Sequence, residues 1–260
     1  MKKLYIIKIG GNIIDDATRL SSFLKNFAAI DAAKILVHGG GKLATRVAEA
    51  MDIPQQMIDG RRITDAETIK VVTMVYAGAI NKNIVASLQA SAVNALGLTG
   101  ADGNVIVAHK RLHPTIDYGF VGDIDWVNTD FINLLLSQNI SLVFAPITHD
   151  GKQHLLNTNA DTIAQELAKA MSSLYEVTLI YCFEKDGVLL DATEDNSVIE
   201  NINLDQFNAM KLEGTVSDGM IPKLQNAFAA MDVGVHSVRI GNADNILALI
   251  QQQSGTGIIK

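Results

Sequence analysis

Short apolar runs alternate with longer segments of helical periodicity along nearly the whole chain, and this alternation restricts the fold more than any other feature. The apolar runs predict strands at residues 4–9, 33–38, 140–147, 177–183 and 235–240, and strands separated by turns within residues 94–111. The periodic segments predict helices at residues 16–30, 42–51, 65–90, 129–138, 159–170, 204–211, 219–231 and 243–251. The pattern indicates an α/β protein, a three-layer αβα sandwich with a mostly parallel central sheet.

Two further segments bear on the organisation of the chain. The sequence "DGRRIT" at residues 59–64 predicts a hairpin or a lid. Residues 172–176 are the predicted boundary between two lobes, residues 1–174 and 175–260, although composition marks this boundary weakly.

Composition and charge exclude several classes of partner. The chain has 260 residues and a net charge of −7, so nucleic acid and anionic membranes are poor partners. A single cysteine, Cys182, excludes an internal disulfide and a multi-cysteine metal site, and it fits a reducing cytoplasm. No segment reads as apolar enough for long enough to span a bilayer. We therefore expect a cytoplasmic protein without a membrane partner.

Two glycine turns follow predicted strands near the N-terminus. Lys8 precedes Gly10 and Gly11, and the triplet 39–41 follows the second strand. Turns at the carboxyl ends of parallel strands are common ligand sites, and their N–H groups can bind phosphate. Neither turn matches a Walker A loop or a dinucleotide fingerprint. The glycines are thus equally compatible with an anion site and with tight turns alone.

Polar residues in the second half can complete such a site. Asn157, Asn159 and Asp161 precede a predicted helix, where they can project into a cleft or simply cap the helix. Lys223 lies near the start of another helix, where a cation opposes the helix dipole. That placement favours an anion ligand, although a solvated surface lysine is equally compatible with the pattern.

Seven motifs together resemble a known family. They are "IIKIGGN", "HGGGKLATRVAE", "DGRRITDAET", "NKNIVASL", "GLTGADG", "LNTNADTIA" and "VSDGMIPKL". Their order is that of the amino acid kinase family, and the N-acetylglutamate kinase subfamily is the most similar. The resemblance covers nearly the whole chain, from Leu4 to the closing "GTGI".

The resemblance implies a reaction and its residues. ATP would phosphorylate the γ-carboxylate of N-acetyl-L-glutamate, a step of arginine biosynthesis. Lys8 and Lys223 would stabilise the transferring phosphoryl group, and Asp161 would hold both ammonium groups. The implied substrate-binding residues are Gly40, Gly41, Arg62 and Asn157. Residues 1–174 would bind the acylglutamate and form a homodimer, with the helix of residues 65–90 near the interface.

The implied nucleotide lobe is residues 175–260. The implied nucleotide and phosphate contacts are Gly10, Gly11, Glu184, Lys185, Gly187, Thr215, Ser217 and Gly219. Mg²⁺ is expected with ATP, held by phosphate oxygens and water rather than by a carboxylate cage. The sequence departs from the family at residues 183–187, "FEKDG", where a Thr/Ser-Asp-Val stretch is usual.

A second departure concerns the acyl group. The residue between Gly60 and Arg62 is usually apolar in the family, and here it is Arg61. A guanidinium suits the terminal carboxylate of a succinyl group better than an acetyl methyl. Alternatively, Arg61 points to solvent, because neighbours on a strand face opposite ways. N-succinyl-L-glutamate is therefore an alternative substrate. Another amino acid kinase and a catalytically silent amino-acid sensor are less favoured.

Overall fold

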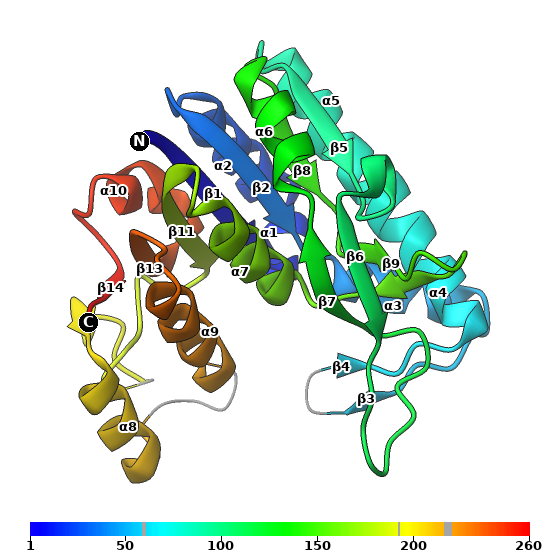
Figure 1. The fold of residues 1–260 in the computed structure, drawn as a ribbon. Helices are drawn as coiled ribbons and strands as arrows, with labels where there is room; N and C mark the ends of the chain where they lie inside the picture. Colours follow the sequence, from blue (N-terminus) through cyan, green and yellow to red (C-terminus); the bar gives the residue numbers. More distant parts are fainter. Residues whose placement is uncertain (59–60, 192, 216–219) are drawn as a thin grey trace.

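The computed structural model describes residues 1–58, 61–191, 193–215 and 220–260 (Figure 1). Its central sheet has eight strands in the order β12-β14-β13-β11-β1-β2-β8-β5. These are β1 (Lys2–Ile9), β2 (Ala33–His38), β5 (Ala95–Leu98), β8 (Ser141–Phe144), β11 (Tyr175–Phe183), β12 (Asn201–Ile202), β13 (Ser237–Asn242) and β14 (Thr256–Ile258). Among these strands every neighbouring pair is parallel except β13–β14.

Helices cover both faces of this sheet, which confirms the three-layer prediction. One face carries α6 (Thr129–Ser137), α7 (Ala160–Met171), α8 (Leu204–Glu213) and α9 (Ile221–Asp232). The other carries α2 (Ala17–Ala28), α3 (Gly41–Ala50), α4 (Ala66–Thr73), η1 (Met74–Ile80), α5 (Asn81–Ala90) and α10 (Ile246–Ile250). Alternate residues of β1 enter the two cores: Leu4 and Ile6 face one, and Tyr5 and Ile7 face the other. The helices on each face thus bury one side of β1, and both sides of this strand are covered.

Smaller elements flank the sheet near the predicted ligand edge. A four-stranded sheet has the order β10-β9-β6-β7, formed by β6 (Ile106–Lys110), β7 (Gly122–Val127), β9 (Ile147–His149) and β10 (Leu155–Asn157). Strands β3 (Met57–Ile58) and β4 (Arg61–Arg62) pair as the expected hairpin. The remaining short elements are α1 (Gly11–Ile14), η2 (Asp102–Asn104) and η3 (Ala243–Asn245).

Some expectations from the sequence need correction. The single strand expected over 140–147 is two strands, because the chain leaves the central sheet after Phe144 and β9 joins the small sheet. The pattern also gave no sign of β7, β10 or β14, which are short or expose polar residues.

The helix over residues 66–90 also corrects the expectation about membranes. By length and composition it is apolar enough to cross a bilayer, with a mean hydropathy of 1.3 over its best window. However, Val72, Tyr76, Ile84 and Leu88 are buried in the core beside the sheet. The composition of this helix is therefore explained by its packing in the fold.

Candidate functional site

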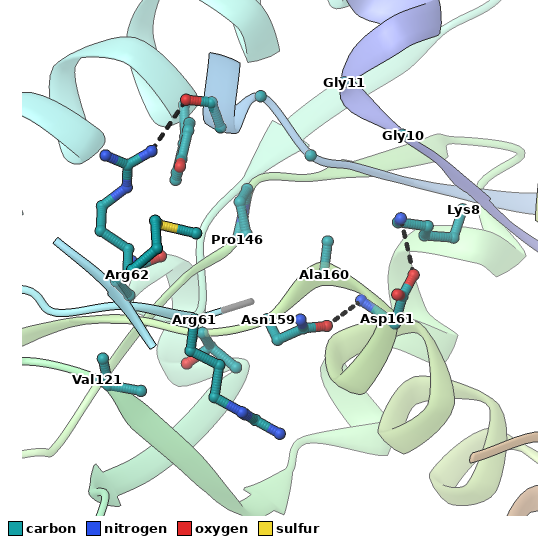
Figure 2. Close-up of a pocket in the computed structure, with 17 residues that line it drawn as sticks. Lys8, Gly10, Gly11, Arg61, Arg62, Val121, Pro146, Asn159, Ala160 and Asp161 are labelled. Carbon is teal, nitrogen blue, oxygen red and sulfur yellow. Dashed lines mark hydrogen bonds and ion pairs between the residues drawn. The ribbon is translucent and has the colours of Figure 1, made fainter. Parts of the chain in front are cut away.

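A cavity of about 230 Å³ lies at the carboxyl ends of β1 and β2. Lys8, the glycine turns 10–11 and 39–41, the hairpin residues 61–62 and the segment 157–161 line it (Figure 2). The parallel register of β1 and β2 places both glycine turns at the same edge. This is the edge where open α/β sheets usually bind ligands.

Asp161 joins two lysines from different elements. Its carboxylate lies 2.7 Å from Lys8 Nζ at the end of β1 and 3.5 Å from Lys223 Nζ in α9. Figure 2 shows Lys8 and Asp161 pointing toward each other beside Gly10. Burial disfavours the charged carboxylate, but the two ammonium groups outweigh it and hold the pKa of Asp161 below its usual range. The site thus carries two cations held by one ionised acid.

The first turn of α7 explains how Asp161 is available for this role. Asn159, not Asp161, caps the helix: its side-chain oxygen accepts hydrogen bonds from the backbone N–H groups of Asp161 and Thr162. Asp161 therefore keeps both carboxylate oxygens for the lysines. This resolves the alternative that Asp161 serves only as a helix cap.

His38 supports the second glycine turn through a hydrogen bond. Its Nδ1 donates to the carbonyl of Gly39 at 2.8 Å, so Nε2 accepts from the Asn81 amide at 3.2 Å. Asn81 also donates to the carbonyl of Val143. The imidazole is buried, and burial lowers its pKa to about 4. His38 is thus a neutral, hydrogen-bonded turn residue.

Gly40 has a backbone conformation that demands glycine. Its φ is +146°, and an added Cβ would lie 2.2 Å from Cδ1 of Ile80. The turn can therefore pass close to the helix η1 and still begin α3 at Gly41. The backbone N–H groups at the start of α3 then border the cavity.

Arg62 lies at the far end of the cavity and is itself well anchored. Its Nη2 donates to the carbonyl of Gly41 and to Thr45 Oγ1, both at 2.9 Å, and its Nη1 donates to Gln55. Asn157 lines the same cavity, and its amide donates to Thr64 Oγ1 at 3.1 Å. A guanidinium fixed in this way is preorganised for a carboxylate.

Arg61 also lines the cavity, together with Met57 and Val121. Figure 2 shows the side chains of Arg61 and Arg62 pointing in opposite directions, as expected for neighbours on β4. Arg61 is half-buried. The two arginines therefore face opposite ways, as expected for neighbours on a strand, and Arg61 still forms part of the cavity wall.

A second hollow of about 280 Å³ adjoins the first. Gly10, Gly11, Lys42, Phe183 and Glu184 are among the residues that line it. It begins at the Lys8 end of the first cavity and reaches the end of β11. Glu184, a candidate nucleotide contact, thus lies beside the two glycines of the first turn.

Several candidate nucleotide residues do not line either cavity. Lys185 pairs with Asp195 at 2.6 Å, and Gly187 packs so tightly that an added Cβ would meet Val198 and Thr256. Thr215 donates to the carbonyl of Met210 at the end of α8. The last two candidates, Ser217 and Gly219, lie outside the described residues.

Sequence reasoning missed several residues that line the first cavity. They are Tyr76 in the π-helical segment, Met57 in the hairpin, Val121 just before β7, and Pro146 in the loop after β8. These residue types carry no chemical signature, and their segments looked like ordinary core or turn. Only the fold shows that they meet at this edge.

Comparison with known protein families gives a match over most of the chain. Residues 3–242 match the model of the amino acid kinase family. The chain belongs to this family. The glycine turns, Lys8, Asp161 and Lys223 all lie within the matched region.

Two relatives are similar to this chain over nearly their whole length. An acetylglutamate kinase from Cytophaga hutchinsonii is 55% identical over 258 residues, which is 99% of this chain and 98% of the relative. An acetylglutamate kinase from Phocaeicola vulgatus is 54% identical over 259 residues, which is 100% of this chain and 99% of the relative.

Solved structures share the fold. A protein from Streptococcus mutans UA159 superposes with a TM-score of 0.82 at 28% identity, with 99% of each chain covered. An N-acetylglutamate synthase from Neisseria gonorrhoeae, solved with coenzyme A and N-acetyl-glutamate, superposes with a TM-score of 0.83 at 20% identity. All of this chain but only 59% of the synthase is covered, so this likeness concerns the fold alone.

Proposed function

We propose that the protein is an acetylglutamate kinase, which transfers the γ-phosphoryl group of ATP to the γ-carboxylate of N-acetyl-L-glutamate in arginine biosynthesis. The observation that carries the proposal is the pair of lysines on Asp161 at one end of a cavity whose other end holds Arg62. The names of the 54–55% identical relatives support the same substrate.

The chemistry needs no general base. A carboxylate nucleophile is already ionised at neutral pH, so catalysis reduces to in-line positioning and neutralisation of charge. Lys8 and Lys223 supply two positive charges for the oxygens of the phosphoryl group in transfer. Asp161 is the positioning residue that keeps the two ammonium groups near each other.

The cavity offers a complementary group for each end of the acylated amino acid. Arg62 faces the α-carboxylate and neutralises its charge, and Asn157 supports the acyl-amide end. The N–H groups of Gly40 and Gly41 face the γ-carboxylate at the start of α3. This orientation points the nucleophile toward Lys8.

ATP enters from the lobe formed by residues 175–260, and the acylglutamate occupies the lobe of residues 1–174. The adjoining hollow, which runs from Gly10 to Glu184, supports this division. Mg²⁺ would enter with ATP, held mainly by phosphate oxygens and water, and it would neutralise part of the phosphate charge.

We further infer a cytoplasmic homodimer that pairs through the helix of residues 66–90. Met74 in this helix is 52% exposed, whereas the neighbouring Val75 is buried. The exposed side of the helix, which includes Met74, is the surface that we expect to pair between copies.

The wall formed by Arg61 favours a second candidate substrate, N-succinyl-L-glutamate. Arg61 lines the cavity beside Met57 and Val121, and it points away from Arg62, the proposed binding residue for the α-carboxylate. A succinyl group would bring a second carboxylate toward this guanidinium.

A substrate panel tests the proposed function. ADP release is measured with N-acetyl-, N-succinyl- and unacylated L-glutamate, with aspartate as a control for another family activity. Turnover of an acylated glutamate, with formation of a hydroxylamine-trapped acyl phosphate, is the expected result. A protein that binds these compounds but releases no ADP with any of them is a sensor rather than a kinase.

A further inference from the structure

The helix over residues 66–90 changes its winding next to the site. Residues Met74–Ile80 form a π-helix between two α-helical segments, and the N–H of Asn81 donates to the carbonyl of Tyr76, five residues earlier. Such π segments are rare and are frequent at functional sites. Here the altered winding places Tyr76 and Ile80 together against the glycine turn.

Tyr76 is part of the cavity wall despite its burial. It is only 5% exposed, and its ring edge lies 3.2 Å from where a Cβ on Gly40 would be. The same side chain lines the cavity that contains Arg62 and Asn157. The aromatic ring therefore packs under the turn, and the side chain also reaches the space for substrate.

The hydroxyl of Tyr76 is near the guanidinium of Arg62, and both side chains line the cavity. Burial raises the pKa of Tyr76, and the charge and a hydrogen bond of Arg62 oppose that rise. A guanidinium only donates, so the phenolic oxygen is the acceptor in this hydrogen bond. Among the described residues, Arg62 is the hydrogen-bond partner found for Tyr76, and no bond donated by the hydroxyl is found. One donor thus remains at the cavity, beside the guanidinium.

We propose that the Tyr76 hydroxyl donates a hydrogen bond to the carboxylate that Arg62 binds, so that Tyr76 and Arg62 together select an N-acylated amino acid with a free α-carboxylate. The inference rests on the proposed function and adds a specificity residue to it. A purely structural residue at this position would not need the hydroxyl, because phenylalanine fills the same space under Gly40 and leaves no buried polar group.

The test compares Tyr76→Phe with the wild-type enzyme on two substrates, N-acetyl-L-glutamate and its α-carboxamide. Losing a hydrogen bond to a charged group raises the KM for N-acetyl-L-glutamate about ten- to a hundredfold, while kcat and the KM for ATP stay unchanged. On the α-carboxamide, which has no charged acceptor, the two enzymes differ much less. Tyr118→Phe is the matched control, because Tyr118 is equally buried and does not line the cavity.

The outcomes separate this inference from the proposed function. A wild-type enzyme with no activity on any acylglutamate defeats both. An active wild-type enzyme whose KM is unaffected by Tyr76→Phe overturns only the role of Tyr76. Equal losses on the acid and the amide, or a fall in kcat alone, also overturn it, because they indicate a structural role in the glycine turn.

Discussion

Lys8 Nζ and a carboxylate oxygen of Asp161 lie 2.7 Å apart, although Lys8 is near the end of the central strand β1 and Asp161 belongs to the first turn of α7. This ion pair holds a cation at the mouth of the cavity. With Lys223 on the second oxygen, the arrangement concentrates positive charge in a protein whose net charge is −7. An acidic chain can bind a polyanion only through such local concentration.

Removal of either lysine should abolish most of the activity. We expect Lys8→Ala or Lys223→Ala to lower kcat about 100- to 1,000-fold, the order for losing one preorganised charge stabiliser. Circular dichroism should show a folded protein in both cases. Lys25→Ala, in the last turn of α2, is the control with unchanged turnover. Near-normal kcat in both site variants would contradict the mechanism.

His38 should make folding stability depend on pH. Its folded pKa of about 4 lies below the usual 6.5, so the unfolded chain takes up the proton first as pH falls. The neutral imidazole therefore contributes about 3 kcal/mol to the free energy of unfolding above pH 6.5. This contribution falls away as the pH decreases from 6.5 to 4. Urea titrations at several pH values measure this slope.

The variant His38→Asn should flatten the slope, whatever its effect on absolute stability. His109→Asn, at a half-exposed position on β6, should retain it. An identical pH dependence in wild type and His38→Asn would show that other groups cause the acid loss.

Two glycine-to-alanine substitutions should have opposite effects. Gly40→Ala combines a positive φ with contact against Ile80, and we expect a loss of about 1–3 kcal/mol of unfolding free energy together with lower activity. Gly78→Ala meets open space within its own copy and should stabilise that copy by about 0.5–1 kcal/mol. Thermal unfolding and kcat/KM are measured for both. A neutral Gly40→Ala would show that the turn relaxes easily.

Arg61 should decide the acyl preference if the alternative substrate is used. In that case N-succinyl-L-glutamate gives the higher kcat/KM, and Arg61→Leu shifts the preference toward the acetyl compound by about tenfold, the value of one charged hydrogen bond. The measurement is the ratio of kcat/KM for the two substrates. Good turnover of acetylglutamate with none of succinylglutamate would rule out the alternative.

The proposed dimer can be tested on the exposed side of the long helix. Met74→Glu should shift the protein from dimer to monomer in light scattering, because a buried charge is costly in an interface. Leu134→Glu, on α6 at the opposite face, is equally exposed and should leave the dimer intact. A Met74→Glu protein that remains dimeric would place the interface elsewhere.

The sequence by itself determined the fold class and most helices and strands. The runs at 4–9 and 177–183 are apolar except at Lys8 and Thr178, because both faces of a parallel sheet are covered. The burial of these strands could therefore be predicted from the sequence. Motif order likewise predicted the family before any comparison of structures. The motifs also named Lys8, Asp161 and Lys223, which the structure brings together.

Only the tertiary structure decided which neighbours complete the cavity. Tyr76 reads as a core residue of a long helix, and nothing in its local pattern predicts a π segment or contact with Gly40. Pro146 likewise reads as part of one strand until β8 and β9 part into different sheets. Periodicity reports which side of an element is buried, whereas the partner on that side depends on strand order and helix packing. Those contacts join residues distant in sequence, and they exist only once the chain has folded.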